Sequence, residues 1–480
     1  MTKLILDRIK DKVKKYYVNK TTIEGYSIDM DTQYIIVHEH FRLSSIGFGV
    51  PHDFWNLGEA IFDSWFDILK SNNITVVSKN KDKLREAIYT EMKCEPTEDN
   101  MKVHINIMEL LGKPFRFIDL FAGIGGFHIA MHHVGGKCVF ASEWDKNARL
   151  SYEANFKKLE PGLFEKNNNG DYIYFNEDIN DADPQQIPDF DICCGGFPCQ
   201  PFSVAGLKRG FEDTRGTLFF NIANIVKEKI HEGYPPRVLF LENVRGLKNH
   251  DKGKTLQVIL ATLEELGYGY SYDVLNAKYF GVPQNRERLF IIAWYKDLIN
   301  VDSFRFPYGI SPDGTTIYEK EKLKEGTLPT KVSDVFEPSI TIDPIFTISD
   351  KMWEGHKARK ERNRLNGKGF GYSLFTGEST YTSTISARYW KDGSEILIDQ
   401  SEKGLNPRTL TPVEAGRLQG YRIIGNGWEH PECADNQNNN EFNPEFKIVV
   451  SKKEAYHQFG NSVAVPVIKR IAEEIIKQLL

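Results

Sequence analysis

Residues 115–127 read Phe-Arg-Phe-Ile-Asp-Leu-Phe-Ala-Gly-Ile-Gly-Gly-Phe, an apolar run that passes into a glycine-rich turn. The run predicts a buried strand, and the residues after the turn predict a helix through Ala130 and Met131. Glycines in such a strand–turn–helix unit let backbone N–H groups and the helix N-terminus face a ligand. The stretch therefore predicts the opening unit of a nucleotide-binding α/β sheet. It lacks the G-x-G-x-x-G pattern, so a dinucleotide is not the expected ligand.

A second predicted strand, 137–142, ends directly before Glu143 and Trp144. A carboxylate about 20 residues beyond the glycines can accept hydrogen bonds from both hydroxyls of a ribose. An aromatic ring beside it can stack on adenine. The glycine-rich turn, the carboxylate and the indole together predict a cofactor that contains adenosine.

A loop with a cysteine follows another apolar run, which ends at Cys193 and Cys194. Residues 195–203 read Gly-Gly-Phe-Pro-Cys-Gln-Pro-Phe-Ser, and a Gly/Pro break after a strand predicts a loop at the sheet edge, where functional residues concentrate. Most free cysteines are small buried hydrophobes, and we interpret Cys193 and Cys194 in that way. Cys199 is different, because Pro198 restricts the backbone just before it and the glycines allow a ligand close approach.

Three later segments complete the pattern: 238–244, an apolar strand that ends in Glu-Asn-Val; 283–288, Pro-Gln-Asn-Arg-Glu-Arg before another strand; and 458–466, Gln-Phe-Gly-Asn-Ser-Val-Ala-Val-Pro. Taken singly, these are explained by a capping glutamate, a solvated arginine pair and a helix start. In this order they resemble the C5-cytosine DNA methyltransferases. The resemblance extends from about Phe115 to the C-terminus.

The resemblance implies that a Cys199 thiolate adds to C6 of cytosine, which turns C5 into a nucleophile that attacks a methyl group. A free thiol has a pKa of about 8.5, so it must be deprotonated or activated by its surroundings. Glu242 matches the acid that faces N3, and Arg288 matches the arginine that faces O2 and the developing charge. Arg286, two residues away on an extended segment, is expected on the same face as Arg288 and is the fourth catalytic candidate.

The resemblance also implies S-adenosylmethionine as the methyl donor. The residues expected to hold it come from the glycine-rich turn, the next two strand ends and the C-terminal segment: Phe121, Gly123, Gly125, Glu143, Trp144, Asp178, Ile179, Asn461, Ser462 and Val463. Asp178 and Ile179 follow Tyr174-Phe175, as the end of a third strand should.

Double-stranded DNA is the implied substrate, and its target base must leave the duplex, because a stacked cytosine cannot present C6 to a protein thiol. The loop after Cys199, rich in glycine and basic residues, suits a mobile lid over DNA, although an ordinary solvated loop would have a similar composition. Residues 345–395 mix Lys/Arg, Gly and aromatics, a composition that suits phosphate contact and insertion into a DNA groove. They resemble the recognition regions of bacterial enzymes that act on CC(A/T)GG or CCNGG sites. The motif core also resembles that of enzymes that act on CCGG sites. The DNA-binding candidates are Ser203, Lys208, Arg209, Arg215, Lys368 and Arg388.

Composition places limits on the protein class. A chain of 480 residues is expected to form two to four domains. No apolar run reaches the ~18 residues of a membrane span, and the N-terminus lacks the features of a secretory signal. Six cysteines without paired spacing argue against a disulfide framework and a zinc site, and favour a reduced, cytosolic protein. The resemblance implies a bacterial protein that is associated with the nucleoid. The net charge of −5 does not by itself indicate a DNA-binding protein. An enzyme that acts on nucleic acid with this charge must concentrate its basic residues on the DNA-binding face.

We therefore predict an α/β fold: a Rossmann-like methyltransferase sheet with a smaller, irregular target-recognition domain. The predicted parts are a mostly helical N-terminal extension (1–113), a catalytic domain (114–294), the target-recognition domain (295–454) and a C-terminal segment (455–480) with a helix from Val463 to Leu480. The resemblance implies that this helix returns to the catalytic domain. We expect a monomer, and a cognate restriction endonuclease in the same system without direct contact.

Two alternatives differ from this interpretation. A tRNA cytosine methyltransferase would share the Cys and Glu chemistry, but such enzymes have a short variable segment where this chain has a long one before Arg408. A DNA-binding regulator that has lost catalysis would not need Cys199, Glu242 and Arg288, all of which are present. Both alternatives are therefore less favoured than a DNA-modifying enzyme.

Overall fold

The computed structural model describes residues 115–198, 218–296, 304–423 and 445–479. They belong to one compact unit, Phe115–Leu479. The predicted N-terminal extension lies outside the described residues, so the helices expected in it are not tested.

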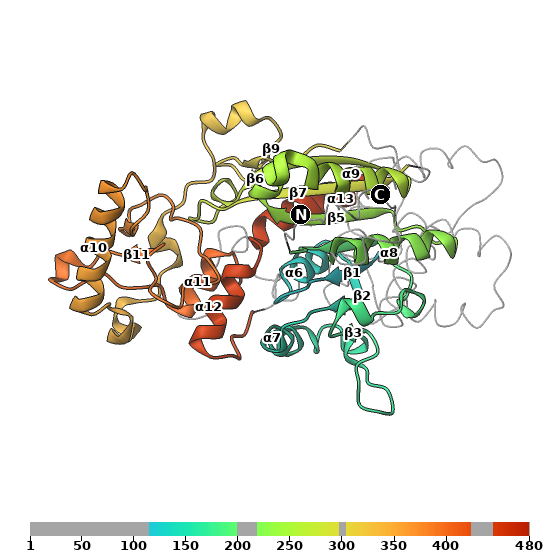
Figure 1. Cartoon of the computed structure of the whole chain (residues 1–480), viewed down its shortest axis with the longest axis horizontal. Helices are drawn as coiled ribbons and strands as arrows, with labels where there is room; N and C mark the ends of the chain where they lie inside the picture. Colours follow the sequence, from blue (N-terminus) through green and yellow to red (C-terminus); the bar gives the residue numbers. More distant parts are fainter. Residues whose placement is uncertain (1–114, 199–217, 297–303, 424–444, 480) are drawn as a thin grey trace, which may run out of the picture. The chain divides into compact units, whose positions relative to one another are not determined.

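A seven-stranded sheet lies at the centre of this unit (Figure 1). Its strands are β1 (Arg116–Leu120), β2 (Lys137–Ser142), β3 (Phe175–Asn176), β4 (Ile192–Gly195), β5 (Val238–Val244), β6 (Tyr268–Asn276) and β7 (Glu287–Tyr295). The spatial order is β3-β2-β1-β4-β5-β7-β6. Strands β1 to β5 are parallel, whereas β7 is antiparallel to both of its neighbours. The strand order reverses between β1 and β4, which is where ligands bind in open α/β sheets.

Helices cover both faces of the sheet. On one face, apolar side chains such as Ile118 and Leu239 share a buried cluster with helices α8 (Leu218–His231) and α9 (Lys254–Glu265). On the other face lie α6 (Gly126–His133) and α7 (Lys146–Phe156), where the Phe127 and Phe240 rings meet edge to face at 4.9 Å. Successive side chains along each strand point to opposite faces of the sheet, so each strand contributes to both layers. This arrangement confirms the predicted α/β class.

The C-terminal segment forms two helices, α12 (Lys452–Asn461) and α13 (Val465–Leu479). We predicted one helix from Val463, whereas α13 begins two residues later. Pro466 lies in its first turn, where a missing N–H has no consequence. Helix α13 packs against α6. Near that contact, a Cβ on Gly126 would lie 2.5 Å from a Val463 methyl carbon, so the C-terminal segment touches the start of α6 closely.

Residues 304–423 are irregular, as the loss of strand–helix alternation predicts. Their elements are β8 (Gly309–Ile310), β9 (Thr316–Ile317), β10 (Leu374–Phe375), β11 (Leu397–Ile398), α10 (Asp350–Leu365) and α11 (Pro412–Leu418). Short 3-10 segments occur here and in the sheet domain at Pro161–Phe164, Ile179–Asp181, Pro184–Gln186, Arg245–Gly253, Ala277–Tyr279, Lys320–Glu325, Val332–Val335, Ser339–Thr341, Pro344–Phe346 and Ser401–Lys403. In Figure 1, α10 and β11 lie at the end of the unit away from the sheet.

Helix α10 lies within residues 345–395, and the sequence analysis assigned no helix to that region. Ser349 caps its N-terminus by accepting a hydrogen bond from the Met352 N–H. His356 is the buried residue of this helix. Because most of its surface faces solvent, α10 shows little apolar periodicity, and that periodicity is the usual sequence signal of a helix.

Candidate active site

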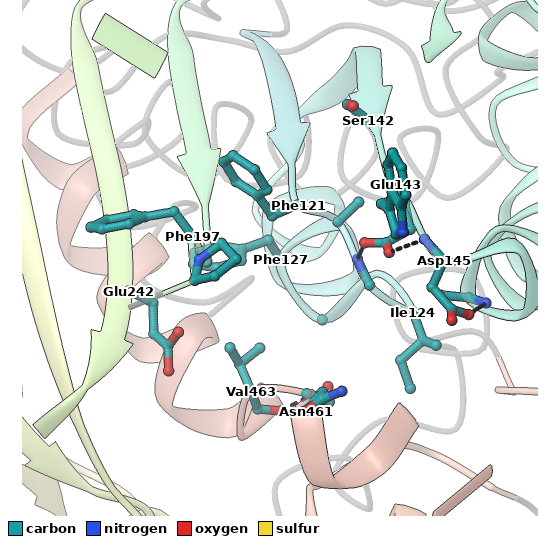
Figure 2. Close-up of a pocket in the computed structure, with 18 of the residues that line it drawn as sticks. Phe121, Ile124, Phe127, Ser142, Glu143, Asp145, Phe197, Glu242, Asn461 and Val463 are labelled. Carbon is teal, nitrogen blue, oxygen red and sulfur yellow. Dashed lines mark hydrogen bonds between the residues drawn. The ribbon is translucent and has the colours of Figure 1, made fainter. Parts of the chain in front are cut away.

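A cavity of about 830 Å³ is lined by the loops after β1 to β5 and by the link between α12 and α13 (Figure 2). It therefore lies at the carboxyl ends of the parallel strands, beside the point where the strand order reverses. In Figure 2, Glu143 and Glu242 lie on opposite sides of this cavity. The cavity thus has one side built from β2 and another built from β5.

The glycine-rich turn after β1 forms part of the first side. Phe121 lines the cavity with a left-handed backbone, at a φ of 56°. The Gly123 N–H donates to Oε2 of Glu143 at 2.7 Å, which ties the turn to the end of β2. Gly125 is not among the described residues that line the cavity. It shapes the turn instead, because its φ is 84° and a Cβ there would lie 2.1 Å from the Phe156 ring.

Glu143 and Trp144 are suited to hold an adenosine group. The second oxygen of Glu143, Oε1, accepts from the Asp145 N–H at 2.8 Å (Figure 2). Each carboxylate oxygen has two lone pairs, so each retains one for a ribose hydroxyl. The Trp144 side chain is 76% exposed and lines the cavity, which leaves an indole face open for stacking.

The other predicted cofactor residues also line this cavity. They are Asp178 and Ile179 after β3, and Asn461, Ser462 and Val463 between α12 and α13. Segments separated by nearly 300 residues of sequence thus meet around one space. Except for Gly125, the structure brings the predicted cofactor residues together.

Glu242 and Arg288 form an ion pair in the cavity wall, with 3.0 Å between Oε1 and Nε. Strands β5 and β7 are antiparallel, and their register pairs Val244 with Arg288, which brings the arginine beside the end of β5. Glu242 is 8% exposed. Burial raises the pKa of its carboxyl above the usual range, and the charges of Arg288 and Arg286 act in the opposite direction. A raised pKa lets this group hold a proton at a higher pH than an exposed glutamate does.

Arg286 does not share this position with Arg288, contrary to our expectation. It is buried and is not among the described residues lining the cavity. Its guanidinium donates to backbone carbonyls of Ile385, Gly460 and Ser462. The Arg286 N–H bonds to the Gln284 carbonyl, only two residues back, at the turn that precedes β7. Strand alternation therefore does not apply between residues 286 and 288, and the two side chains diverge.

The loop that carries the cysteine is described as far as Pro198. Gly196, Phe197 and Pro198 line the cavity. Cys199, Ser203, Lys208, Arg209 and Arg215 lie outside the described residues. The buried Asn243 side chain donates to the Phe197 carbonyl at 2.7 Å, so it ties this loop to the end of β5. We assigned Asn243 no role from the sequence, although its place directly after Glu242 was the available signal.

Further lining residues escaped sequence reasoning because they have no distinctive spacing. They include Ser142, Glu177, Asn180 and His457. Lys368 and Arg388, the two described DNA-binding candidates, are exposed and belong to the irregular region. Neither is among the described residues that line the cavity.

Comparison with known proteins agrees with this arrangement. Residues 115–477 match the family described as C-5 cytosine-specific DNA methylase. The Type II methyltransferase M.SsoII of Shigella sonnei is 47% identical over 367 residues, which cover 76% of this chain and 81% of that protein. The Type II methyltransferase M.HpaII of Haemophilus parainfluenzae is 38% identical over 371 residues, which cover 77% of this chain and 91% of that protein.

Solved structures agree at the level of the fold. The S. pombe Dnmt2 methyltransferase matches with a TM-score of 0.53 at 19% identity, over 76% of this chain and 99% of that chain. None of the helices in the described parts of this chain has the length and apolar content needed to cross a bilayer. The chain belongs to the C-5 cytosine-specific DNA methylase family and is a DNA (cytosine-5)-methyltransferase.

Proposed function

We propose that this enzyme methylates C5 of a flipped-out cytosine in a short, specific duplex site through a covalent bond between Cys199 and C6. We further propose that it is the modification enzyme of a bacterial Type II restriction–modification system. It would act as a monomer in the cytoplasm. The cognate endonuclease would recognise the same DNA site but would not bind the methyltransferase.

One observation carries this proposal: the Glu242–Arg288 pair shares a cavity with the Glu143–Trp144 turn and with Pro198. An acid for the base, a turn for the methyl donor and the residue before the cysteine thus border one space. A cavity of about 830 Å³ is within the size range of small-molecule sites.

The proposed chemistry follows from these side chains. The Cys199 thiolate adds to C6 while protonated Glu242 donates a hydrogen bond or a proton to N3, which draws electrons from the ring. Arg288 stabilises the charge that develops at O2. C5 of the adduct would take up the methyl group, with S-adenosylhomocysteine as the leaving group. Loss of the C5 proton to water or another base would then expel the thiolate from C6. Asn243 supports these steps by holding the loop that leads to Cys199.

S-adenosylmethionine is the proposed methyl donor, and it supplies an electrophilic methyl group when bound. We propose that Glu143 accepts hydrogen bonds from its ribose and that Trp144 stacks on its adenine. Phe121, Gly123, Asp178, Ile179 and the 461–463 segment would complete its site, with Gly125 acting through the shape of the turn.

Trp144→Ala should weaken binding of S-adenosylmethionine by about 1–3 kcal/mol, the scale reported for stacking a base on an aromatic ring. Titration calorimetry with S-adenosylhomocysteine measures this loss directly. Leu150→Ala is a matched control, because Leu150 is also an exposed apolar residue near the start of α7 but does not line the cavity. Equal affinities for Trp144→Ala and wild type would contradict adenine stacking on this indole.

We propose that Arg388 reads a guanine and that Lys368 contacts phosphate. Both are exposed, as DNA contacts require. Guanine in the major groove is most often bound by a bidentate arginine. Residues 203, 208, 209 and 215 would contact DNA from the loop after Cys199, which would close over the duplex once the base has left the stack.

Arg388→Ala should relax the specificity of the recognition site at one position. The free energy that discriminates against a wrong base pair at that position should fall by about 1–3 kcal/mol. Bisulfite sequencing of a random duplex library methylated by the variant gives the new site. Lys368→Ala is the comparison: loss of a phosphate contact lowers yield for all sequences alike and reduces the salt dependence. An unchanged site with uniformly lower yield for Arg388→Ala would show that Arg388 contacts only phosphate.

Bisulfite sequencing of plasmid from cells that express the chain tests the main proposal. We expect C5 methylation at one short site flanked by CC and GG. Absence of methylated cytosine in the plasmid would contradict the proposed DNA substrate, and a site without those flanks would reject the expected specificity.

A further inference from the structure

Helix α12 contributes to two parts of the molecule. Its C-terminal residues His457, Gln458, Gly460 and Asn461 line the cavity. Tyr456 and Lys453 of the same helix contact what we call the recognition segment, Thr382–Trp390. The Tyr456 and Tyr389 rings meet at 5.2 Å, and Nζ of Lys453 lies 4.8 Å from the centre of the Trp390 ring. One helix thus borders the cavity and supports the segment that presents Arg388.

The two backbones come together at Gly460. A Cβ at this position would lie 2.3 Å from the carbonyl carbon of Ser386 and 2.3 Å from the nitrogen of Ala387. No side chain fits in that space without moving one backbone away from the other. The cavity wall and the recognition segment are therefore in direct main-chain contact.

Arg286 joins the same two backbones. Its Nη1 donates to the Ile385 carbonyl at 3.2 Å, and its Nη2 donates to the carbonyls of Gly460, at 3.2 Å, and Ser462. The side chain is 2% exposed, and its Nε has no hydrogen-bond partner in the described structure. Its hydrogen-bond acceptors are neutral carbonyls, so burial of this guanidinium is costly, and an apolar side chain could fill the space without that cost. The planar fork of arginine, in contrast, is able to hold several carbonyls at once.

The connection from Arg286 to the exposed Arg388 is short. Gln284 supports it, since its Oε1 accepts from the Ile385 N–H at 3.0 Å and its Nε2 donates to the Leu418 carbonyl at 3.0 Å. Next along the chain, Oγ of Ser386 accepts from the Arg388 N–H at 3.1 Å. A change in the position of Ile385 therefore reaches Arg388 through consecutive residues.

We propose that Arg286 is a positioning residue that couples the cofactor site to the recognition segment, so that cofactor and duplex DNA strengthen each other's binding. It acts through Ile385 on one side and through Gly460 and Ser462 on the other. The inference rests on the cofactor and DNA sites proposed above. Linkage requires the effect to be reciprocal, so either ligand can report it.

The test compares the affinity of the full chain for S-adenosylhomocysteine with and without a duplex that carries the site found by bisulfite sequencing. Coupling between ligand sites is typically on the order of 5–150-fold, and we expect wild type to fall in that range. Arg286→Lys keeps the charge but loses the planar fork, and should bring the ratio of the two affinities close to unity. Gly460→Ala should reduce the same ratio while Arg286 itself is unchanged, because the added methyl group separates the two backbones.

Arg359→Lys is the matched control. Arg359 is also an arginine that donates to a carbonyl, that of Gly371, at 2.8 Å and 3.1 Å, and it pairs with Asp392 at 2.9 Å. Both partners lie within residues 345–395. Arg359, Gly371 and Asp392 are not among the described residues that line the cavity. We expect Arg359→Lys to weaken DNA binding while the coupling ratio stays at the wild-type value. A purely structural role of Arg286 would leave its ratio unchanged as well.

Hydrogen–deuterium exchange gives a second readout that needs no DNA. S-adenosylhomocysteine should slow exchange of the amides of residues 383–390 in wild type, and in Arg286→Lys it should slow only the amides around the cavity. A wild-type coupling ratio kept by folded Arg286→Lys and Gly460→Ala would overturn the inference. So would wild-type binding of S-adenosylhomocysteine that DNA does not change, which leaves the proposed function intact. Failure of wild type to bind S-adenosylhomocysteine would instead reject the proposed cofactor site.

Discussion

Cys199→Ser should lower methyl transfer by about 10⁴-fold or more, the scale on which loss of a catalytic nucleophile is felt. A serine hydroxyl is hardly ionised at neutral pH, so it cannot add to C6 as a thiolate does. Affinity for S-adenosylhomocysteine should be retained, because the described cofactor candidates come from other segments. Single-turnover methylation and calorimetry on the same preparation separate the two properties.

A duplex that contains 5-fluorocytosine gives an independent test of the covalent step. Fluorine at C5 cannot leave as a proton does, so wild type should remain covalently attached, and Cys199→Ser should not. Cys193→Ala is the control, since Cys193 is buried in β4 and burial raises the pKa of its thiol. Trapping by Cys199→Ser, or loss of trapping in folded Cys193→Ala, would assign the nucleophile to another residue.

Glu242→Gln should reduce the methylation rate by about 10²–10⁴-fold, the usual contribution of a positioned acid or base. Glutamine can donate a hydrogen bond to N3 but cannot transfer a proton to it. Because burial raises the pKa of Glu242, the proton-donating form persists to higher pH than in an exposed glutamate. That form is present below the raised pKa and is lost as pH rises through it. The wild-type rate constant for methylation should therefore fall as the pH rises through this pKa, and the rate constant of the variant should not. Single-turnover reactions across a range of pH measure both.

Glu287→Gln is the matched control for Glu242→Gln. It makes the same chemical change at the neighbouring end of β7, in a pair with Arg245 that is largely exposed. Exposed pairs contribute little free energy, so the rate should stay close to wild type. A Glu242→Gln rate within the range of this control would remove Glu242 from the chemistry.

Much of the sheet was predictable from the sequence. Strand β4 ends at Gly195, which marks a turn, and β5 carries Glu242 two residues before its end at Val244. Buried parallel strands appear as short apolar runs, so their existence and order along the chain could be stated. Helix α10 was missed for the opposite reason, because an exposed helix carries no apolar stripe.

The candidate site was predictable only where its residues belong to ordered motifs. Glu143, Trp144, Glu242 and Arg288 were assigned in this way, and all four line the cavity. Asn243 was not assigned, because its role depends on the Phe197 carbonyl, a main-chain group that leaves no mark in the sequence. Residues beyond Pro198 stay predictions.

The sequence by itself determined the fold class and the family, because apolar periodicity and local motif chemistry are properties of neighbouring residues. Through the resemblance, it also predicts which side chains act as acid and nucleophile. Tertiary structure decided where Arg286 lies: its partner Gly460 is 174 residues away, and the turn before β7 directs it away from Arg288. Contacts across such distances depend on how the whole chain packs, and no local pattern specifies them.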